Sequence, residues 1–351
     1  MIIHVPHAAS TEAVFLLAST RSTLVRGLVQ GLPLYYTPPI MTKFNYENGV
    51  AFMRDSFVPF KEASLSIASS PVLYGLAVYT VFSLNWNEKE GKLYAFRFAD
   101  HYNRLINSAR IMGFDSFTKK WPYEKFEKTM LELVRKNDIK EDALVRISIF
   151  IDAVIAGTKI TGLPVALSAF VYPLGKILNP KGIKVCVSSW RHNPDDVIPN
   201  RAKVNGAYVS NCLMKNEALQ NGYDDAISLD HSGHVTEGTV ANLFLVRNGK
   251  LITPSVSSDI LEGITRASIM EIAHDLKIPV EERQVDRTEL YISDEAFICG
   301  SSARVVPILS IDKRVVGSGK IGPIASKLAE RYLAAQKGMT KEYKEWRMEV
   351  K

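Results

Sequence analysis

The chain has 351 residues, of which 46% are hydrophobic and 23% are charged, and its formal net charge is +6. This length and composition are those of a globular protein with room for two domains that each have a core. Its lysines and arginines are scattered along the sequence, which argues against a nucleic-acid partner but permits anionic small molecules.

No stretch of the chain is apolar for long enough to predict a membrane span. The longest apolar region, residues 147–174, is interrupted by Asp152, Lys159, Gly162 and Pro164, whereas a transmembrane helix needs about 20 apolar residues. The three cysteines are widely spaced and form no C-x-x-C pair, which argues against a disulfide framework or a structural zinc site. We therefore expect no membrane span, no bound metal and a reducing compartment, the cytoplasm.

The first 40 residues differ in composition from the rest of the chain. Glu12 is their only acid, Arg21 and Arg26 are their only strong bases, and they are rich in serine, threonine and leucine. One interpretation is a transit-like extension, which would place the protein in an organelle. The other is that the true start is Met41. Both interpretations stay open on the sequence alone.

Residues 41–171 are predicted to form a small α/β domain. The apolar run at 73–86 is compatible with a helix or with a strand, and that choice stays open. The β-branched runs that flank residues 156–164 predict two buried strands joined by a loop. The other elements predicted here are a hairpin at 49–60 that turns at Arg54–Asp55, a turn and strand at 87–98, helices at 99–114 and 123–138, and a strand at 141–152.

Residues 172–182 contain two prolines and two glycines and are interpreted as the linker to a larger domain, residues 183–351. Helical and strand patterns are mixed in this second domain as well, so the fold class is α/β in two domains. The elements predicted in it are strands at 183–190, 225–230, 241–249 and 279–285, helices at 208–221, 264–277 and 323–336, and two strands joined by a tight turn within 295–311.

Two motifs suggest cofactor or metal chemistry but are better explained as turns. Residues 317–322 match G-x-G-x-x-G, yet only 29 residues follow them, too few to complete a dinucleotide-binding half. His231 and His234 are close enough in sequence for a metal site, but no third ligand lies near them, so a hairpin turn is the better interpretation.

Two residues in the second half of the chain, Lys203 and Glu237, each have more than one interpretation when taken alone. Lys203 stands five residues before Tyr208, just ahead of a predicted helix, and a lysine there is most simply a solvated charge or a helix cap. Glu237 precedes Gly238 and a strongly apolar strand, so it is either a turn acid or a carboxylate held for a function. Their meaning depends on what accompanies them.

Two turns can bind an anion. Gly263, Ile264 and Thr265 open a predicted helix, where free backbone N–H groups and a hydroxyl form an anion cradle, although Thr265 could simply be an N-cap. Ser301 and Ser302 lie in a second tight turn, whose hydroxyl and N–H groups can also hold an anion.

Together these features match the requirements of pyridoxal 5′-phosphate (PLP). That cofactor needs an amine for a Schiff base, an acid against its ring nitrogen, and donors around its phosphate group. The lysine must also lose its proton, which burial and cationic neighbours promote by lowering its pKa.

From about Glu47 to about Lys337 the chain resembles the fold type IV PLP enzymes, and most closely the branched-chain-amino-acid aminotransferases. The matching stretches occur in the order and spacing of that family: 188–230, 236–254, 260–266, 300–303 and 316–323. The resemblance implies two α/β domains with the cofactor between them. The second domain would have a β-barrel-like core, and the enzyme would be a homodimer.

The resemblance also implies a role for each matching residue. Lys203 would form the Schiff base and carry the proton, and Glu237 would hold the pyridine nitrogen. The remaining roles are Arg97, Ile264, Thr265 and Ser301 for the phosphate group, Tyr208 beside the cofactor ring, Tyr74 and Arg146 in the substrate pocket, and the backbone of Ser301 and Ser302 for the substrate α-carboxylate.

Several positions depart from the family pattern. Leu144 replaces the usual tyrosine two residues before Arg146, and the usual Phe-Glu-Gly ending of the segment after Tyr74 is replaced by residues 79–81. Ala241 and Arg304 stand where relatives often have glutamate. We therefore expect an intact cofactor site and an altered substrate pocket.

The activity implied is transfer of the amino group of leucine, isoleucine or valine to 2-oxoglutarate by a ping-pong mechanism, with amino acids and 2-oxo acids as the small-molecule partners. Two alternatives share the fold: an aminodeoxychorismate lyase, and a D-amino-acid or (R)-amine transaminase. Arg146 weighs against the second, whereas Thr80 and the altered motif keep the first open. A non-catalytic protein on this fold is disfavoured by the intact set of cofactor residues.

Overall fold

The computed structural model describes residues 45–350 apart from residues 115, 156, 176 and 177. The first 40 residues, and with them the choice between a transit-like extension and a start at Met41, lie outside the described residues. Within the described part of the chain, no helix combines the length and apolar character needed to cross a lipid bilayer.

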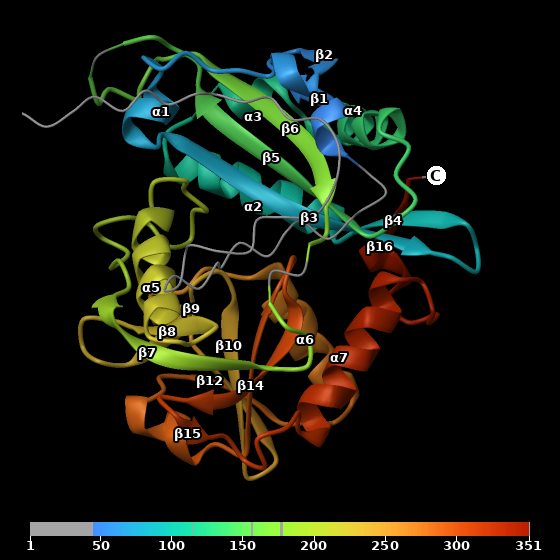
Figure 1. Cartoon of the computed structure of the whole chain (residues 1–351). Coiled ribbons are helices and arrows are strands. Elements are labelled where there is room, and N and C mark those ends of the chain that lie inside the picture. Colours follow the sequence, from blue (N-terminus) through green and yellow to red (C-terminus); the bar gives the residue numbers. More distant parts are fainter. Residues whose placement is uncertain (1–44, 115, 156, 176–177, 351) are drawn as a thin grey trace, which may run out of the picture. The chain divides into compact units, whose positions relative to one another are not determined.

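Six strands from the first half of the chain and one from its C-terminal end build a seven-stranded antiparallel sheet (Figure 1). The predicted hairpin is confirmed, and Arg54 in its turn has a left-handed φ of 59°. The strand order is β16-β4-β3-β5-β6-β1-β2. The strands are β1 Val50–Met53, β2 Ser56–Pro59, β3 Ala77–Asn87, β4 Lys92–Phe96, β5 Ala143–Ile151, β6 Val165–Pro173 and β16 Arg347–Glu349.

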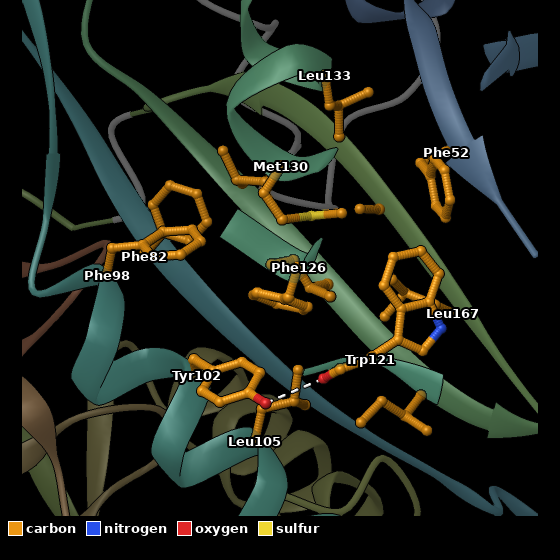
Figure 2. Packing of buried hydrophobic residues seen from close by; sticks show 14 of the residues in the cluster. Phe52, Phe82, Phe98, Tyr102, Leu105, Trp121, Phe126, Met130, Leu133 and Leu167 are labelled. Atoms are coloured by element: carbon orange, nitrogen blue, oxygen red, sulfur yellow. Dashed lines mark hydrogen bonds between the residues drawn. The ribbon is translucent and has the colours of Figure 1, made fainter. Parts of the chain in front are cut away.

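Helices cover one face of this sheet and enclose an aromatic core (Figure 2). Phe98, Tyr102 and Phe126 pack ring against ring, and the Tyr102 hydroxyl donates a hydrogen bond to the Trp121 carbonyl at 2.9 Å. The helical pattern of the sequence places these residues on the inner sides of α2 and α4. The helices here are α1 Ser70–Tyr74, α2 Phe98–Ile111, α3 Phe117–Lys120 and α4 Tyr123–Lys136, with single 3₁₀ turns at Tyr46–Asn48 and Phe60–Glu62.

The second half builds a nine-stranded mixed sheet whose two end strands approach each other. Its main path is β12-β11-β10-β13-β14-β7-β8-β9, and β15 pairs with β14. Val235 in β9 donates a hydrogen bond to the Val285 carbonyl just beyond β12 at 2.8 Å, which gives the expected barrel-like core. The strands are β7 Ile183–Arg191, β8 Asp225–Leu229, β9 Val235–Gly238, β10 Asn242–Arg247, β11 Lys250–Pro254, β12 Val280–Arg283, β13 Glu295–Gly300, β14 Arg304–Ile311 and β15 Arg314–Val315.

Three helices pack against this curled sheet. Phe244 and Phe297 stack on neighbouring strands with ring centroids 5.1 Å apart, in the buried cluster that also holds Ile269 and Tyr332 of the covering helices. The helices are α5 Tyr208–Gln220, α6 Ile264–Asp275 and α7 Pro323–Gln336, with 3₁₀ segments at Arg287–Ile292 and Lys344–Trp346. Helix α5 packs against β7 and β8, whereas α6 and α7 pack against β10 and β13 (Figure 1).

The structure resolves the open choice at residues 73–86 and adds elements that the sequence pattern did not predict. Helix α1 ends at Tyr74, and β3 begins at Ala77 after Gly75, whose φ is +67°. Short strands β9, β11 and β16 were not predicted as separate elements. Residues 317–322 form a turn before α7, as expected. Strand β6 runs to Pro173 and β7 begins at Ile183, so the linker limits of 172–182 and the domain limits stay predictions.

Candidate active site

A cavity of about 230 Å³ lies where elements of both sheets meet. The first sheet contributes side chains from β3, β5 and β6, and the second contributes the segment before α5, strand β9, the start of α6 and the β13–β14 turn. Of the residues predicted to form a site, those that line it are Arg146, Lys203, Tyr208, Glu237, Ile264, Thr265, Ser301 and Ser302.

Lys203 is held by the backbone of its own segment. Its N–H donates a hydrogen bond to the Ser108 hydroxyl at 3.1 Å, and its carbonyl accepts one from the Tyr79 N–H at 2.9 Å. Its ammonium group donates to the Tyr208 hydroxyl and lies 4.9 Å from the ring centroids of Tyr79 and Tyr208. Lys203 is therefore an anchored cavity residue and not a solvated surface charge.

The surroundings of Lys203 favour the neutral amine. Burial, with the positive charges of Arg104 and Arg146, lowers the pKa of Lys203 to about 7, and the charge of Glu237 opposes this shift only in part. Near neutral pH a large fraction of the amine is therefore unprotonated and can act as a nucleophile or a base.

Glu237 is a held carboxylate. It is 8% exposed on β9, and its Oε2 accepts a hydrogen bond from the Asn242 side-chain amide at 2.7 Å. The Leu261 N–H also reaches Oε2 at 3.4 Å, and the His192 imidazole lies 3.3 Å from Oε1. A buried carboxylate with several donors around it keeps one orientation, which is what a group that must meet a ring nitrogen needs.

The two anion-binding turns are present, with one correction. Helix α6 begins at Ile264, its N-cap is Gly263, and no side chain caps it, so the alternative of Thr265 as an N-cap is wrong. The Thr265 hydroxyl instead lies 3.2 Å from that of Tyr332. A Cβ at position 263 would lie 1.9 Å from Asn242 Oδ1, so this close approach requires glycine. The second turn, 301–303, joins β13 and β14.

The structure does not bring Arg97 to the cavity. Its guanidinium pairs with Asp100 at 2.5 Å, lies 3.6 Å from Glu271 and covers the Trp346 ring at 4.6 Å. Arg104, seven residues further along the same segment, lines the cavity instead. The structure therefore places Arg104, two helical turns later, and not Arg97, among the residues that line the cavity.

Tyr74 is also absent from the cavity lining. It is 41% exposed at the end of α1, and its hydroxyl accepts a hydrogen bond from the Gly157 N–H. Tyr79 and Tyr172 line the cavity but were not predicted as site residues. The Arg146 guanidinium carbon lies 3.7 Å from the Tyr79 ring centroid, so these two side chains form one wall.

Some of the positions that depart from the family pattern lie outside the cavity and others line it. Thr80 is fully buried, and its hydroxyl contacts His101 and Arg104. Leu144 is also fully buried, and Arg304 pairs with Asp142 at 2.7 Å. Tyr79, Val81 and Ala241 line the cavity, so the expected alteration of the pocket lies at these three positions.

Comparisons with known proteins support this geometry. The family model described as amino-transferase class IV matches residues 77–311, which contain every cavity residue named above. The chain belongs to the class IV aminotransferases. Among these class IV aminotransferases, a probable branched-chain-amino-acid aminotransferase of Aquifex aeolicus is 41% identical over 299 residues, which are 84% of this chain and 95% of that protein.

Solved class IV aminotransferases have the same fold. The branched-chain aminotransferase of Thermoproteus uzoniensis, solved with norvaline, has a TM-score of 0.81 and 36% identity, over 86% of this chain and 99% of that one. The branched-chain amino acid aminotransferase of Thermobaculum terrenum, solved in its PLP form, has a TM-score of 0.81 and 32% identity, over 88% of this chain and 100% of that one.

Proposed function

We propose that the chain is a PLP-dependent aminotransferase that moves the amino group of leucine, isoleucine or valine to 2-oxoglutarate by a ping-pong mechanism. The observation that carries the proposal is the buried Lys203 amine, with its pKa lowered to about 7, in one cavity with the held carboxylate of Glu237. Relatives that the chain covers almost completely carry branched-chain aminotransferase names.

The cavity residues fit PLP. Among the described residues, the buried Arg104 Nε has no hydrogen-bond partner, although Arg104 lines the cavity, so an anion beside it would satisfy the donor. The start of α6 adds unpaired backbone N–H groups and the Thr265 hydroxyl to the same cavity. Arg104, Ile264, Thr265 and Ser301 would therefore hold the phosphate group.

Each remaining residue would then have one task. When bound, PLP supplies an aldehyde carbon that bonds amines and a ring that withdraws electrons from the substrate Cα. Lys203 would bond that carbon at rest and, once displaced by the substrate amine, would take the proton from Cα and return it. Glu237 would hold the proton of the ring nitrogen, and Tyr208 would orient the Lys203 amine through their hydrogen bond.

The substrate wall would accept both an aliphatic side chain and a carboxylate. Tyr79, Val81 and Tyr172 give it apolar surface, and Arg146 gives it a cation that lies opposite Val81 on the neighbouring strand. One pocket could thus hold leucine in one half-reaction and the side-chain carboxylate of glutamate in the other. The N–H groups of the turn at 301–302 would hold the α-carboxylate.

The homodimer is part of the proposal. Val72, Leu73 and Tyr74 on α1 are 41–53% exposed, and Val154, which follows β5, is 67% exposed. Because Val154 forms a β-bridge with Ser69 beside α1, these residues make one exposed apolar surface of the kind that subunits cover. Light scattering on the purified protein measures the subunit number.

We also propose a cytoplasmic location.

The geometry of the cavity does not favour either alternative activity, the aminodeoxychorismate lyase or the D-amino-acid or (R)-amine transaminase. Thr80, which kept an aminodeoxychorismate lyase open, contacts α2 and does not reach the cavity. Arg146, which weighs against a D-amino-acid or (R)-amine transaminase, lines the cavity. The branched-chain L-amino acid remains the donor that the cavity favours.

The absorbance spectrum of the purified protein, loaded with PLP, tests the proposal. L-leucine should abolish the long-wavelength band of the bound cofactor, 2-oxoglutarate should restore it, and D-alanine should do neither. Borohydride should fix the cofactor to the wild-type protein and to the exposed-lysine control Lys320→Ala, but not to Lys203→Ala. A band that only D-alanine abolishes would overturn the substrate, and absence of a band would overturn the cofactor.

A further inference from the structure

His192 lies directly behind Glu237, outside the cavity. It follows β7, is 5% exposed, and its backbone N–H donates to the Leu229 carbonyl at 2.9 Å. Its Nε2 lies 3.3 Å from Glu237 Oε1. A buried histidine against the carboxylate that meets the cofactor ring is not used by the mechanism described above.

Both ring nitrogens of His192 face oxygen acceptors. Nδ1 lies 3.3 Å from the carbonyl of Asn193, and Nε2 faces the Glu237 carboxylate. A neutral imidazole has one N–H group and can satisfy one of these acceptors, whereas the imidazolium has two. The geometry therefore favours the doubly protonated, cationic ring.

The charges around His192 have the same effect. Burial alone lowers the pKa of His192, but the hydrogen bond and charge of Glu237, the Asn193 carbonyl and the charge of Asp259 outweigh burial and raise it. Both ionisable groups named here are acidic: Glu237 on β9 and Asp259 in the loop before α6. Arg104 and Lys203, the cations that act on Glu237 from the cavity side, make no ion pair with it among the described residues.

We propose that His192, as an imidazolium, is a positioning residue that keeps Glu237 ionised and fixes its orientation. A cation beside a carboxylate makes that carboxylate a weaker base. The proton that Glu237 shares with the cofactor ring nitrogen then stays on the nitrogen, where it makes the ring withdraw electrons. This role rests on the proposed PLP chemistry, but the charge state of His192 does not.

The first experiment uses the cofactor-free protein and reads the His192–Glu237 pair alone. Histidine is labelled with ¹⁵N, and the imidazole of His192 is titrated by NMR in the wild-type and Glu237→Gln proteins. We expect His192 to titrate above its usual value of 6.5 in the wild type. It should titrate at lower pH in the variant, because the hydrogen bond and the charge of Glu237, the largest contributions that oppose burial, are then lost. A wild-type pKa at or below 6.5, or no change in the variant, would overturn the proposal.

The second experiment reads the cofactor ring. Protein loaded with ¹⁵N-PLP is compared as wild type, His192→Gln, which keeps an N–H donor without the charge, and His192→Leu, which loses both. His231→Gln, an exposed histidine, is the control. In His192→Gln the ring-nitrogen signal should move toward the unprotonated position. The kcat for transamination should fall about tenfold with little change in KM, because a change of one unit in the ring-nitrogen pKa changes the protonated fraction about tenfold.

The outcomes separate this proposal from the proposed function. If the chain does not bind PLP, the first experiment still decides whether His192 is cationic. If PLP binds but the ring-nitrogen signal is the same in His192→Gln and the wild type, Glu237 does not depend on the imidazolium and the inference fails. If His192→Gln does not fold, the pH dependence of the ring-nitrogen signal in the wild-type protein tests the proposal instead. It should lose its protonated character as pH rises through the measured His192 pKa, and independence from that pKa would refute the role.

Discussion

Replacement of Arg304 by alanine tests how strongly the turn at residues 301–303 is held to the seven-stranded sheet. Arg304 begins β14 directly after residues 301–303, and its guanidinium donates hydrogen bonds to Asp142 at 2.7 Å and to Asn85 at 3.2 Å. The side chains of Arg304 and Asp142 are only 24% and 20% exposed. A charge-assisted hydrogen bond in such a place contributes about 1.5–3 kcal/mol, so Arg304→Ala should lower the free energy of unfolding by about 2 kcal/mol.

A second variant separates the ion pair from backbone strain. Arg304 has a left-handed φ of 58°, which costs a residue with a Cβ about 1 kcal/mol or more. Arg304→Gly also loses the ion pair but relieves this strain, so it should be about 1 kcal/mol more stable than Arg304→Ala. The assay is urea unfolding of the cofactor-free protein, followed by tryptophan fluorescence.

Arg54 supplies the matched control. It also has a left-handed φ, of 59°, and pairs with Asp152 at 2.8 Å, but the two side chains are 48% and 26% exposed. Solvent weakens such a pair, so Arg54→Ala should cost less than about 1 kcal/mol. Equal losses in the two alanine variants would refute the reasoning from burial, and an Arg304→Gly protein less stable than Arg304→Ala would refute the reasoning from strain.

Acid should weaken the same Arg304–Asp142 ion pair. Burial raises the pKa of Asp142, but the hydrogen bond and charge of Arg304, with smaller contributions from the Trp86 N–H and the charge of Lys337, together hold that pKa below the ordinary 3.8. The contribution of Asp142 is therefore complete above that value and is lost as pH falls below it.

Further predictions concern the cavity. Arg104→Gln should weaken PLP binding about tenfold or more, measured by equilibrium dialysis, because it removes the cation beside the proposed phosphate position. Arg97→Gln should leave PLP binding unchanged. Equal losses in the two variants would show that Arg97 also contributes to PLP binding. The rate at which cofactor-free protein captures PLP should rise with pH and reach half its maximum near 7, measured by stopped-flow absorbance, because Lys203 must be neutral, and a midpoint near 10 would contradict its lowered pKa. Val81→Gly should raise kcat/KM for phenylalanine relative to valine by about tenfold, since it widens the wall opposite Arg146, and an unchanged ratio would show that Val81 does not limit donor size.

The sequence was sufficient to predict four of the residues that line the cavity. Lys203 lies in the segment before α5, Glu237 in β9, Thr265 at the start of α6 and Ser301 just after β13, and all four line the cavity. Each was ambiguous when taken alone, and it was their combination, together with the family resemblance of the surrounding motifs, that predicted a shared site.

The errors arose where direction depended on tertiary structure. Thr80 and Tyr79 are adjacent in one strand, so they point to opposite faces, but the segment was compatible with a helix as well and the faces could not be assigned. Arg97 and Arg104 lie near one helix, and only packing shows which guanidinium points inward. His192 has no local signal, because its partner Glu237 lies 45 residues away on another strand.

The return of β16 to the first sheet has a consequence for folding. β16 pairs with β4, and the Lys92–Glu349 contact across this pair joins residues 257 positions apart. While the chain is being made, the edge of β4 therefore stays open until almost all of the described residues have left the ribosome. An open strand edge recruits other strands, so aggregation during synthesis should be most sensitive to changes at residues 347–349.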